Sequence, residues 1–136
     1  MKNIVFLDTS YVLALELAND QNHLKTKKHW QQIGKALPRI ITTSYIFDEI
    51  VTYFNSRNYH AKAVQVGNSL LQSTYVSTID VDRQLFLQGW QYFQQHDDKQ
   101  YSLTDCISFI VMQQNNISIA FSLDKHFSQA GFIKQP

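Results

Sequence analysis

The sequence predicts an α/β fold with three layers, in which helices cover both faces of a central parallel sheet. Short and almost uninterrupted apolar runs, such as residues 3–7 and 117–121, are typical of strands that are buried on both faces. Helical segments separate these runs, which is the pattern of right-handed crossovers between parallel strands. The 136 residues include only 4 Gly and 2 Pro, so we expect one domain over residues 1–136 with short loops.

The first half of the chain alternates between strand-like and helix-like segments. We expect strands at residues 3–7 and 39–43, and helices at residues 10–18, 21–36, 44–56 and 59–73. The second strand, Arg-Ile-Ile-Thr-Thr, is rich in the β-branched side chains that favour strands. Pro38 stands just beyond the second helix, where a residue that cannot continue a helix is expected. Asn58 separates the third helix from the fourth.

The second half continues the same alternation. We expect strands at residues 75–79, 117–121 and around 132–133, helices at residues 82–95 and 102–115, and a short helix after Asp124. The run Tyr-Val-Ser-Thr-Ile at 75–79 again combines aromatic and β-branched residues. Abundant glutamines fall on the polar faces of the two long helices, which explains them without a special role.

Composition narrows the class of protein. The single cysteine, Cys106, lies in an apolar stretch, so the chain forms no internal disulfide and the thiol is expected to be a small buried group. The net charge of +1 is not that of a protein that binds nucleic acid by charge alone. It does not exclude a nuclease, because a bound metal adds positive charge that the sequence does not count.

The first apolar run, at residues 4–7, is too short for the core of a signal peptide or for a membrane span. We therefore expect a cytoplasmic protein without a membrane partner.

Four acidic residues stand at the edges of apolar segments: Asp8, Glu49, Asp105 and Asp124. Partly buried carboxylates are costly unless positive charge compensates them, and no Lys or Arg accompanies the first three in the sequence. A divalent cation would hold such a cluster together. The four acids therefore point to a metal-dependent nuclease.

Their positions in the predicted fold support a common site. Ligands of open parallel sheets bind beyond the carboxyl ends of the strands, where Asp8 and Asp124 both lie. Glu49 shares a helical face with Ile46 and Tyr53, so we expect it to lean toward packed structure, whereas Asp48 should be solvated. Asp105 is placed similarly to Glu49, on a helix that could face the same crevice.

Each acid also has a purely structural interpretation. Ser102 and Asp105 form the pattern of a helix capping box, which taken alone is the better explanation of Asp105. Asp8 and Asp124 could cap the helices that follow them, and Glu49 alone would be a tolerated acid at a helix edge. Only the presence of all four acids together favours a site.

Other polar residues are better explained by structure than by function. Asp80 and Asp82 suit the start of a helix, and Asp97 and Asp98 suit a solvated loop. The histidines show no metal-ligand spacing, and for His126 a surface or packing role is favoured over contact with RNA. Several basic residues could contact phosphates, although for any one of them a solvated role is the better prediction: Lys25, Lys27, Lys28, Arg39, Arg57, Lys62 and Lys125. Core packing is likewise favoured over base stacking for Tyr11, Tyr45 and Tyr53.

The segments around the four acids resemble the PIN-domain ribonuclease family, and within it the VapC-type toxins. The matching segments are Phe6-Leu7-Asp8-Thr9-Ser10, Thr43-Ser44-Tyr45-Ile46-Phe47-Asp48-Glu49, Ser102-Leu103-Thr104-Asp105-Cys106 and Ser122-Leu123-Asp124-Lys125-His126-Phe127. One mild departure is Ser122, where the family usually carries threonine; serine keeps the hydroxyl group.

The resemblance implies a parallel-sheet α/β/α fold and hydrolysis of RNA phosphodiesters with Mg²⁺ or Mn²⁺. It implies that Asp8, Glu49, Asp105 and Asp124 bind the metal and carry the catalysis, with Ser10 supporting the site. Our hypothesis is that Asp8 and Asp105 are the core ligands and that Asp124 closes the site. Glu49 would bind a second ion or orient the attacking water. The resemblance also implies products with a 5′-phosphate and a 3′-hydroxyl, an antitoxin partner and a homodimer.

Two other classes of protein fit the sequence less well. Haloacid-dehalogenase-type phosphatases need a second aspartate two residues after the first, where this chain has Ser10, and a response-regulator receiver needs an acidic pair at the end of the first strand. A PIN fold that binds RNA or protein without cutting, or a solitary PIN nuclease without an antitoxin, is the remaining alternative. The RNA target and the number of metal ions stay open.

Overall fold

A computed structural model describes residues 3–136 of the chain. The predicted α/β/α fold is confirmed: five parallel strands form one sheet in the order β3-β2-β1-β4-β5. The strands are β1 (Ile4–Leu7), β2 (Arg39–Thr43), β3 (Val76–Ile79), β4 (Ile119–Phe121) and β5 (Ile133–Gln135). The helices are α1 (Thr9–Glu16), α2 (His23–Ile33), α3 (Ser44–Ser56), α4 (His60–Gln72), α5 (Arg83–Gln95), α6 (Leu103–Gln114) and α7 (Lys125–Gln129).

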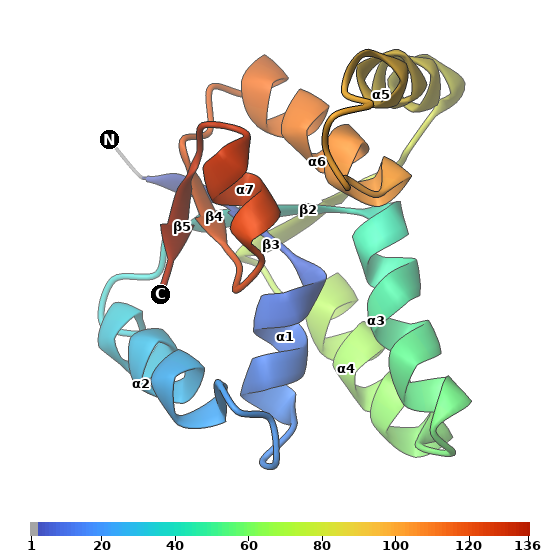
Figure 1. The fold of residues 1–136 in the computed structure, drawn as a ribbon. Helices are drawn as coiled ribbons and strands as arrows, with labels where there is room; N and C mark the ends of the chain where they lie inside the picture. Colours follow the sequence, from blue (N-terminus) through green and yellow to red (C-terminus); the bar gives the residue numbers. More distant parts are fainter. Residues whose placement is uncertain (1–2) are drawn as a thin grey trace.

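The helices form two layers around the sheet (Figure 1). α1 to α4 lie on one side, where α3 and α4 pack against each other and against β2 and β3. α5 and α6 pack together on the other side, and α7 lies next to β5 and α6. Apolar side chains from both layers meet the central strands, and the largest fully buried ones include Phe6, Tyr11, Phe54, Phe109, Phe121 and Phe127. Cys106 is buried among them, as predicted.

Most predicted elements are present with small differences at their ends. α2 is shorter than the predicted 21–36, because the chain leaves the helix at Gly34 and enters a turn. β5 begins at Ile133, slightly later than predicted, after Gly131 turns the chain with a φ of 95°. Asn58 adopts a φ of 64° between α3 and α4, a conformation that Asn tolerates better than most residues.

The register of the sheet determines which chain segments meet at its carboxyl edge. Leu7 of β1 pairs with Phe121 of β4, so the residues that follow these two strands lie side by side. The backbone N–H of Asp8 donates to the carbonyl of Phe121 at 3.0 Å, which extends this pairing by one residue. α1 and α3 begin at the same edge, directly after β1 and β2. Within residues 3–136, no helix combines the length and apolar character needed to cross a membrane.

Candidate metal centre

All four predicted acids lie in one pocket at the carboxyl edge of the sheet. The pocket has a volume of about 320 Å³. Its lining residues are Asp8, Thr9, Ser10, Leu13, Glu49, Gln100, Ser102, Asp105, Asp124 and His126. No Lys or Arg belongs to this lining, so the charges of the acids meet no fixed ammonium or guanidinium group there. The structure thus brings together residues from the ends of β1 and β4 and from α3 and α6.

Asp8 is the most deeply buried of the four, with an exposed fraction of 5%. Its Oδ2 accepts hydrogen bonds from the hydroxyl groups of Ser10 and Ser122, each at 2.7 Å. Burial raises the pKa of Asp8 to about 6, the two serine hydroxyls oppose this rise, and the charges of Asp105 and Asp124 add to it. The alternative role as a cap of α1 is wrong, because the Asp8 side chain makes no capping hydrogen bond.

Asp105 lines the pocket and also has the structural role that the sequence suggested. It forms the predicted capping box with Ser102: Asp105 Oδ2 accepts from the Ser102 N–H at 3.0 Å, and the Ser102 hydroxyl accepts from the Asp105 N–H at 3.0 Å. The same Oδ2 lies 2.8 Å from Nδ1 of His126. Because a carboxylate only accepts, this distance assigns the proton to Nδ1. The capping box therefore holds Asp105 in the pocket.

Asp124 and His126 complete this side of the pocket. Asp124 caps α7, as its structural interpretation predicted: its Oδ1 accepts from the His126 N–H at 2.9 Å. One ligand atom each from Asp105, Asp124 and His126 lie within 4.8 Å of one another, close enough to share an ion. The His126 ring packs edge-on against Tyr101, with 5.4 Å between the ring centroids, so the predicted packing role is present. Its contact with Asp105, which is 21 residues away in the chain, left no signal in the sequence.

Glu49 occupies the rim of the pocket. The residue is exposed, so the prediction that it leans into packed structure is wrong, although its side chain still lines the pocket. Its Oε1 accepts from the Thr9 hydroxyl at 2.6 Å. Desolvation raises the pKa of Glu49, the hydroxyls of Thr9 and Thr104 oppose the rise, and the charge of Asp105 adds to it. Asp48 is exposed, as predicted.

The three aspartates share one arrangement of their oxygen atoms. Oδ2 of Asp8, Oδ2 of Asp105 and Oδ1 of Asp124 are held by hydrogen bonds, while the second oxygen of each accepts none from residues 3–136. In that part of the chain, the only fully buried polar side-chain atom without a partner is Thr26 Oγ1, so these free oxygens are not sealed from solvent. Each aspartate can offer one oxygen to a ligand. Hard divalent cations such as Mg²⁺ and Mn²⁺ prefer such donors, so the residues present fit a metal ion.

The remaining acids behave as their structural interpretation predicted or lie elsewhere. Asp82 caps α5 by accepting from the Leu85 N–H at 2.8 Å. Asp80, Asp97 and Asp98 are exposed and do not line the pocket. The sequence did not identify Thr9 and Gln100 as pocket residues. A carboxylate next to an apolar segment is unusual because burying its charge is costly, whereas a neutral polar residue there is not.

Both the sequence and the fold of this chain are similar to those of known proteins. A PIN domain family model matches residues 5–133. The 23S rRNA-specific endonuclease VapC20 of Mycobacterium tuberculosis is 34% identical over 131 residues, which cover 96% of this chain and 97% of that protein. The crystal structure of VapC20, described as a sarcin–ricin loop cleaving toxin, superposes with a TM-score of 0.85 at 33% identity and covers 95% of this chain and 96% of its own.

More distant structures share the fold. FitAcB from Neisseria gonorrhoeae superposes with a TM-score of 0.67 at 13% identity, covering 97% of this chain and 96% of that one. VapBC2 from Rickettsia felis, described as bound to a DNA fragment from its promoter, gives 0.66 at 12% identity with 97% of each chain covered. The family model spans almost the whole chain, and the pocket lies where the sheet topology places ligands. This chain is a member of the PIN domain family.

Proposed function

We propose that this protein is a metal-dependent endoribonuclease that binds Mg²⁺ or Mn²⁺ through Asp8, Glu49, Asp105 and Asp124, and that it acts as the toxin of a toxin–antitoxin pair. The observation that carries the proposal is the convergence of four carboxylates from distant segments on a pocket without lysine or arginine. A PIN domain that only binds partners has no use for such a cluster, so the pocket argues against the non-catalytic alternative.

Electrostatics explain why the pocket needs a cation. Two unit charges about 4 Å apart repel by roughly 4 kcal/mol at an effective dielectric constant of about 20. Burial and mutual repulsion already raise the pKa of Asp8 to about 6, so without a cation the pocket takes up an extra proton as the pH falls below about 6. A bound cation would neutralise the acids, polarise the scissile phosphate and supply a water of lowered pKa.

The protein's own residues would orient this chemistry. Ser10 and Ser122 hold one oxygen of Asp8, and Ser102 and His126 hold one oxygen of Asp105, so the free oxygens have fixed directions. Glu49 at the rim stands where it can accept a proton from an approaching water or add a further oxygen ligand.

The relative VapC20 suggests the class of substrate. Its names describe a 23S rRNA-specific endonuclease and a sarcin–ricin loop cleaving toxin, and this chain matches almost all of it. We infer that this protein also cuts ribosomal RNA in the cytoplasm. A cell that makes such an enzyme needs an inhibitor, so an antitoxin is the expected partner, and a homodimer is the expected assembly. Co-purification with the product of the adjacent gene, followed by sedimentation analysis of the free protein, would test both.

Cleavage assays test the proposal directly. A transcribed 23S rRNA fragment that contains the sarcin–ricin loop should be cut in Mg²⁺ or Mn²⁺ and left intact in EDTA. Asp8→Asn and Asp105→Asn should each lower kcat/KM by more than roughly 100-fold. That is the upper range for losing a residue that only hydrogen-bonds to a metal ligand, and a ligand itself should matter more. Asp97→Asn, an exposed acid outside the pocket, is the matched control and should cut normally. Equal cleavage by all four proteins would refute the assignment.

A further inference from the structure

Charge is unevenly distributed along this chain. Residues 21–47 contain five basic residues and no acidic one, whereas the rest of the chain contains seven basic and eleven acidic residues. The net charge of +1 therefore hides a segment of +5 beside a remainder of −4. Most of the basic segment is α2 and the turn that follows it.

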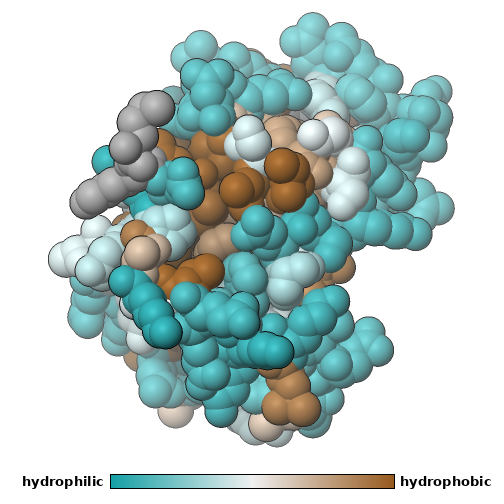
Figure 2. Space-filling model, turned by 90° about the vertical axis from the view of Figure 1, so that its left-hand side faces the viewer, coloured by the Kyte–Doolittle hydropathy of each residue, from teal (hydrophilic) through white to brown (hydrophobic). Residues whose placement is uncertain are grey.

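Three of the five basic residues of this segment lie on α2, Lys35 lies in the turn that follows it, and Arg39 belongs to β2. Lys25, Lys27, Lys28 and Lys35, here called the lysine face, are all exposed, with exposed Gln31 and Gln32 between them. Lys25 and Lys28 are three residues apart and share one side of α2, and Lys35 follows two residues after the helix ends. Figure 2 views the molecule from the side of α2, and its lower part is mostly hydrophilic.

The charges of the lysine face are not compensated by the protein. Within residues 3–136, the ion pairs made by Lys or Arg are Lys62–Glu16 and Lys99–Asp98, and neither involves α2. The exposed ammonium groups are thus available to an external anion. A group of exposed, flexible cations on one short segment, with glutamines between Lys28 and Lys35, is complementary to the repeating phosphates of a nucleic-acid backbone.

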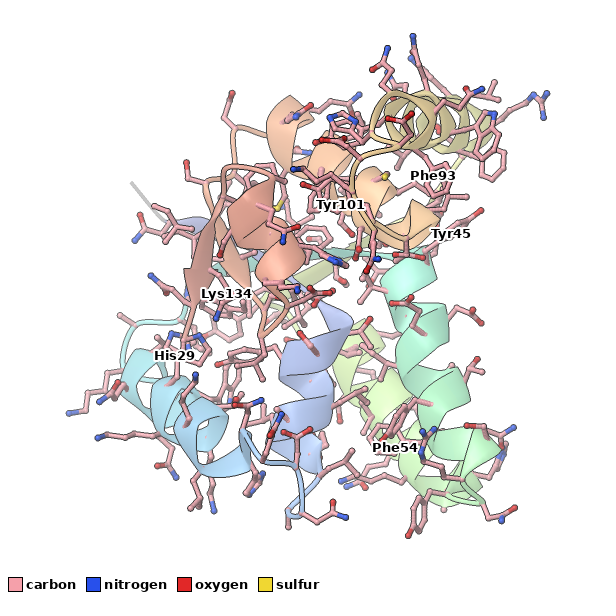
Figure 3. All side chains as sticks on the ribbon, viewed as in Figure 1. His29, Tyr45, Phe54, Phe93, Tyr101 and Lys134 are labelled. Atoms are coloured by element: carbon pink, nitrogen blue, oxygen red, sulfur yellow. The ribbon has the colours of Figure 1, made fainter. Side chains whose placement is uncertain are left out.

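The opposite side of α2 ties this surface to the metal centre. His29 faces β5 and Lys134 (Figure 3), and its Nδ1 lies 2.7 Å from the Tyr11 hydroxyl. Tyr11 directly follows Ser10, which donates to Asp8. His23 Nδ1, near the start of α2, also lies 2.8 Å from the Ala14 carbonyl of α1. These contacts fix α2 against the helix that begins at the pocket, so an RNA held by α2 keeps a defined position relative to the acids.

We propose that the lysine face, on α2 and the turn that follows it, is a docking surface for the phosphate backbone of a structured RNA substrate, outside the acidic pocket. This inference rests on the proposed function, because it assigns a second contact region to the same substrate. The pocket repels a polyanion until a cation is bound, and the lysine face supplies attraction that the pocket lacks. It reads no base sequence, so it contributes affinity rather than cleavage specificity.

Binding measured without cleavage tests the docking surface. The probe is a transcribed 23S rRNA fragment that contains the sarcin–ricin loop, titrated at several KCl concentrations with Asp8→Asn protein so that the RNA stays intact. The test variant adds Lys25→Gln, Lys28→Gln and Lys35→Gln. The matched control adds Arg57→Gln, Arg83→Gln and Lys99→Gln, which are exposed cations outside the basic segment. Both sets change the formal net charge of the parent by the same amount.

The test variant should bind the RNA about tenfold or more weaker than the control at moderate salt. Its plot of log Kd against log salt should be less steep by about 2, because each lost phosphate contact removes roughly 0.7–0.9 from the slope. The double variant Lys25→Gln with Lys28→Gln should fall between the two. With Asp8 intact, the three lysine changes should raise KM and leave kcat unchanged.

Equal affinities and slopes for the test and control variants would overturn the docking surface and leave the proposed nuclease untouched. Conversely, absence of cleavage by the unchanged protein would sink the nuclease, while the binding comparison would still decide whether α2 holds RNA. Thermal unfolding of each variant confirms that the exposed substitutions leave the fold intact.

Discussion

The acidic pocket and the lysine face carry opposite charges, and they differ even more in how those charges are held. In the pocket, hydrogen bonds from serine hydroxyls, two backbone amides and an imidazole fix one oxygen of each aspartate. On α2, the ammonium groups have no ion-pair partner within residues 3–136. Carboxylate oxygens with fixed directions suit a metal ion with a strict coordination geometry. Flexible ammonium groups without ion-pair partners suit a chain of phosphates. The two surfaces therefore respond differently to mutation.

The largest expected effect concerns Asp8, the acid that is most constrained. In the folded, metal-free protein its pKa is raised from 3.8 to about 6, so the folded state holds a proton that the unfolded chain releases between these values. The free energy of unfolding should fall as pH rises through this window, by about 3 kcal/mol at about 1.4 kcal/mol per unit. Urea unfolding in EDTA from pH 4 to pH 8 measures this loss.

Asp8→Asn removes this titration. In EDTA at pH 7 the variant should be more stable than the parent by up to about 3 kcal/mol, since it no longer buries a charge. Mg²⁺ or Mn²⁺ should raise the melting temperature of the parent and raise that of Asp8→Asn much less. Parallel pH curves, or equal shifts with metal, would contradict a pocket organised around a cation. The lysine-face variants should show neither behaviour.

The intermediate effect concerns His126, which holds Asp105 from outside the acidic quartet. His126→Ala removes the donor to Asp105 Oδ2 and should weaken Mn²⁺ binding about 10- to 100-fold, the range typical for a residue that orients a metal ligand. His126→Asn keeps a donor near the position of Nδ1 and should recover most of the affinity. Calorimetric titration of Mn²⁺ without RNA measures this. Equal affinity of the Ala variant and the parent would show that Asp105 needs no such support.

These two residues illustrate what the sequence could and could not predict. Asp8 could be predicted as a site residue because a carboxylate directly after a buried strand is unusual, and this is visible in a single sequence. The strand at residues 39–43 and the helix at 44–56 were predicted with the observed bounds, because a β-branched run ends where Thr43 caps the helix. His126 was placed in a surface or packing role, because its partner Asp105 is distant in the chain.

The lysine face shows the same limit in another form. The absence of acids between residues 21 and 47 is visible in the sequence, yet a solvated role is the better prediction for each of Lys25, Lys27 and Lys28 taken alone. Whether those charges are exposed together and unpaired depends on where acids from other segments fall. Only the folded chain answers this. Glu16, for example, precedes the basic segment in the sequence but forms its ion pair with Lys62 of α4 and not with a lysine of α2.

The smallest expected effect concerns Ser122, which links two acids of the pocket. Its hydroxyl donates to Asp8 Oδ2 at 2.7 Å and accepts from the Asp124 N–H at 3.0 Å. Ser122→Ala leaves Asp8 with Ser10 as its remaining hydroxyl donor, so the pKa of Asp8 should rise further. A hydrogen bond worth about 1 kcal/mol corresponds to somewhat less than one pH unit. In a plot of cleavage rate against pH, the acidic limb should therefore move to higher pH by that amount.

Ser108→Ala is the control for this change. Ser108 is equally buried, but its hydroxyl donates to the Thr104 carbonyl within α6, away from Asp8. The control should lose some stability without shifting the pH profile. If both variants shifted the profile equally, the effect would come from general loosening of the core and not from the oxygen that Ser122 holds. A shift confined to Ser122→Ala would show that the pocket's charges are tuned one hydrogen bond at a time, in contrast to the additive cations of α2.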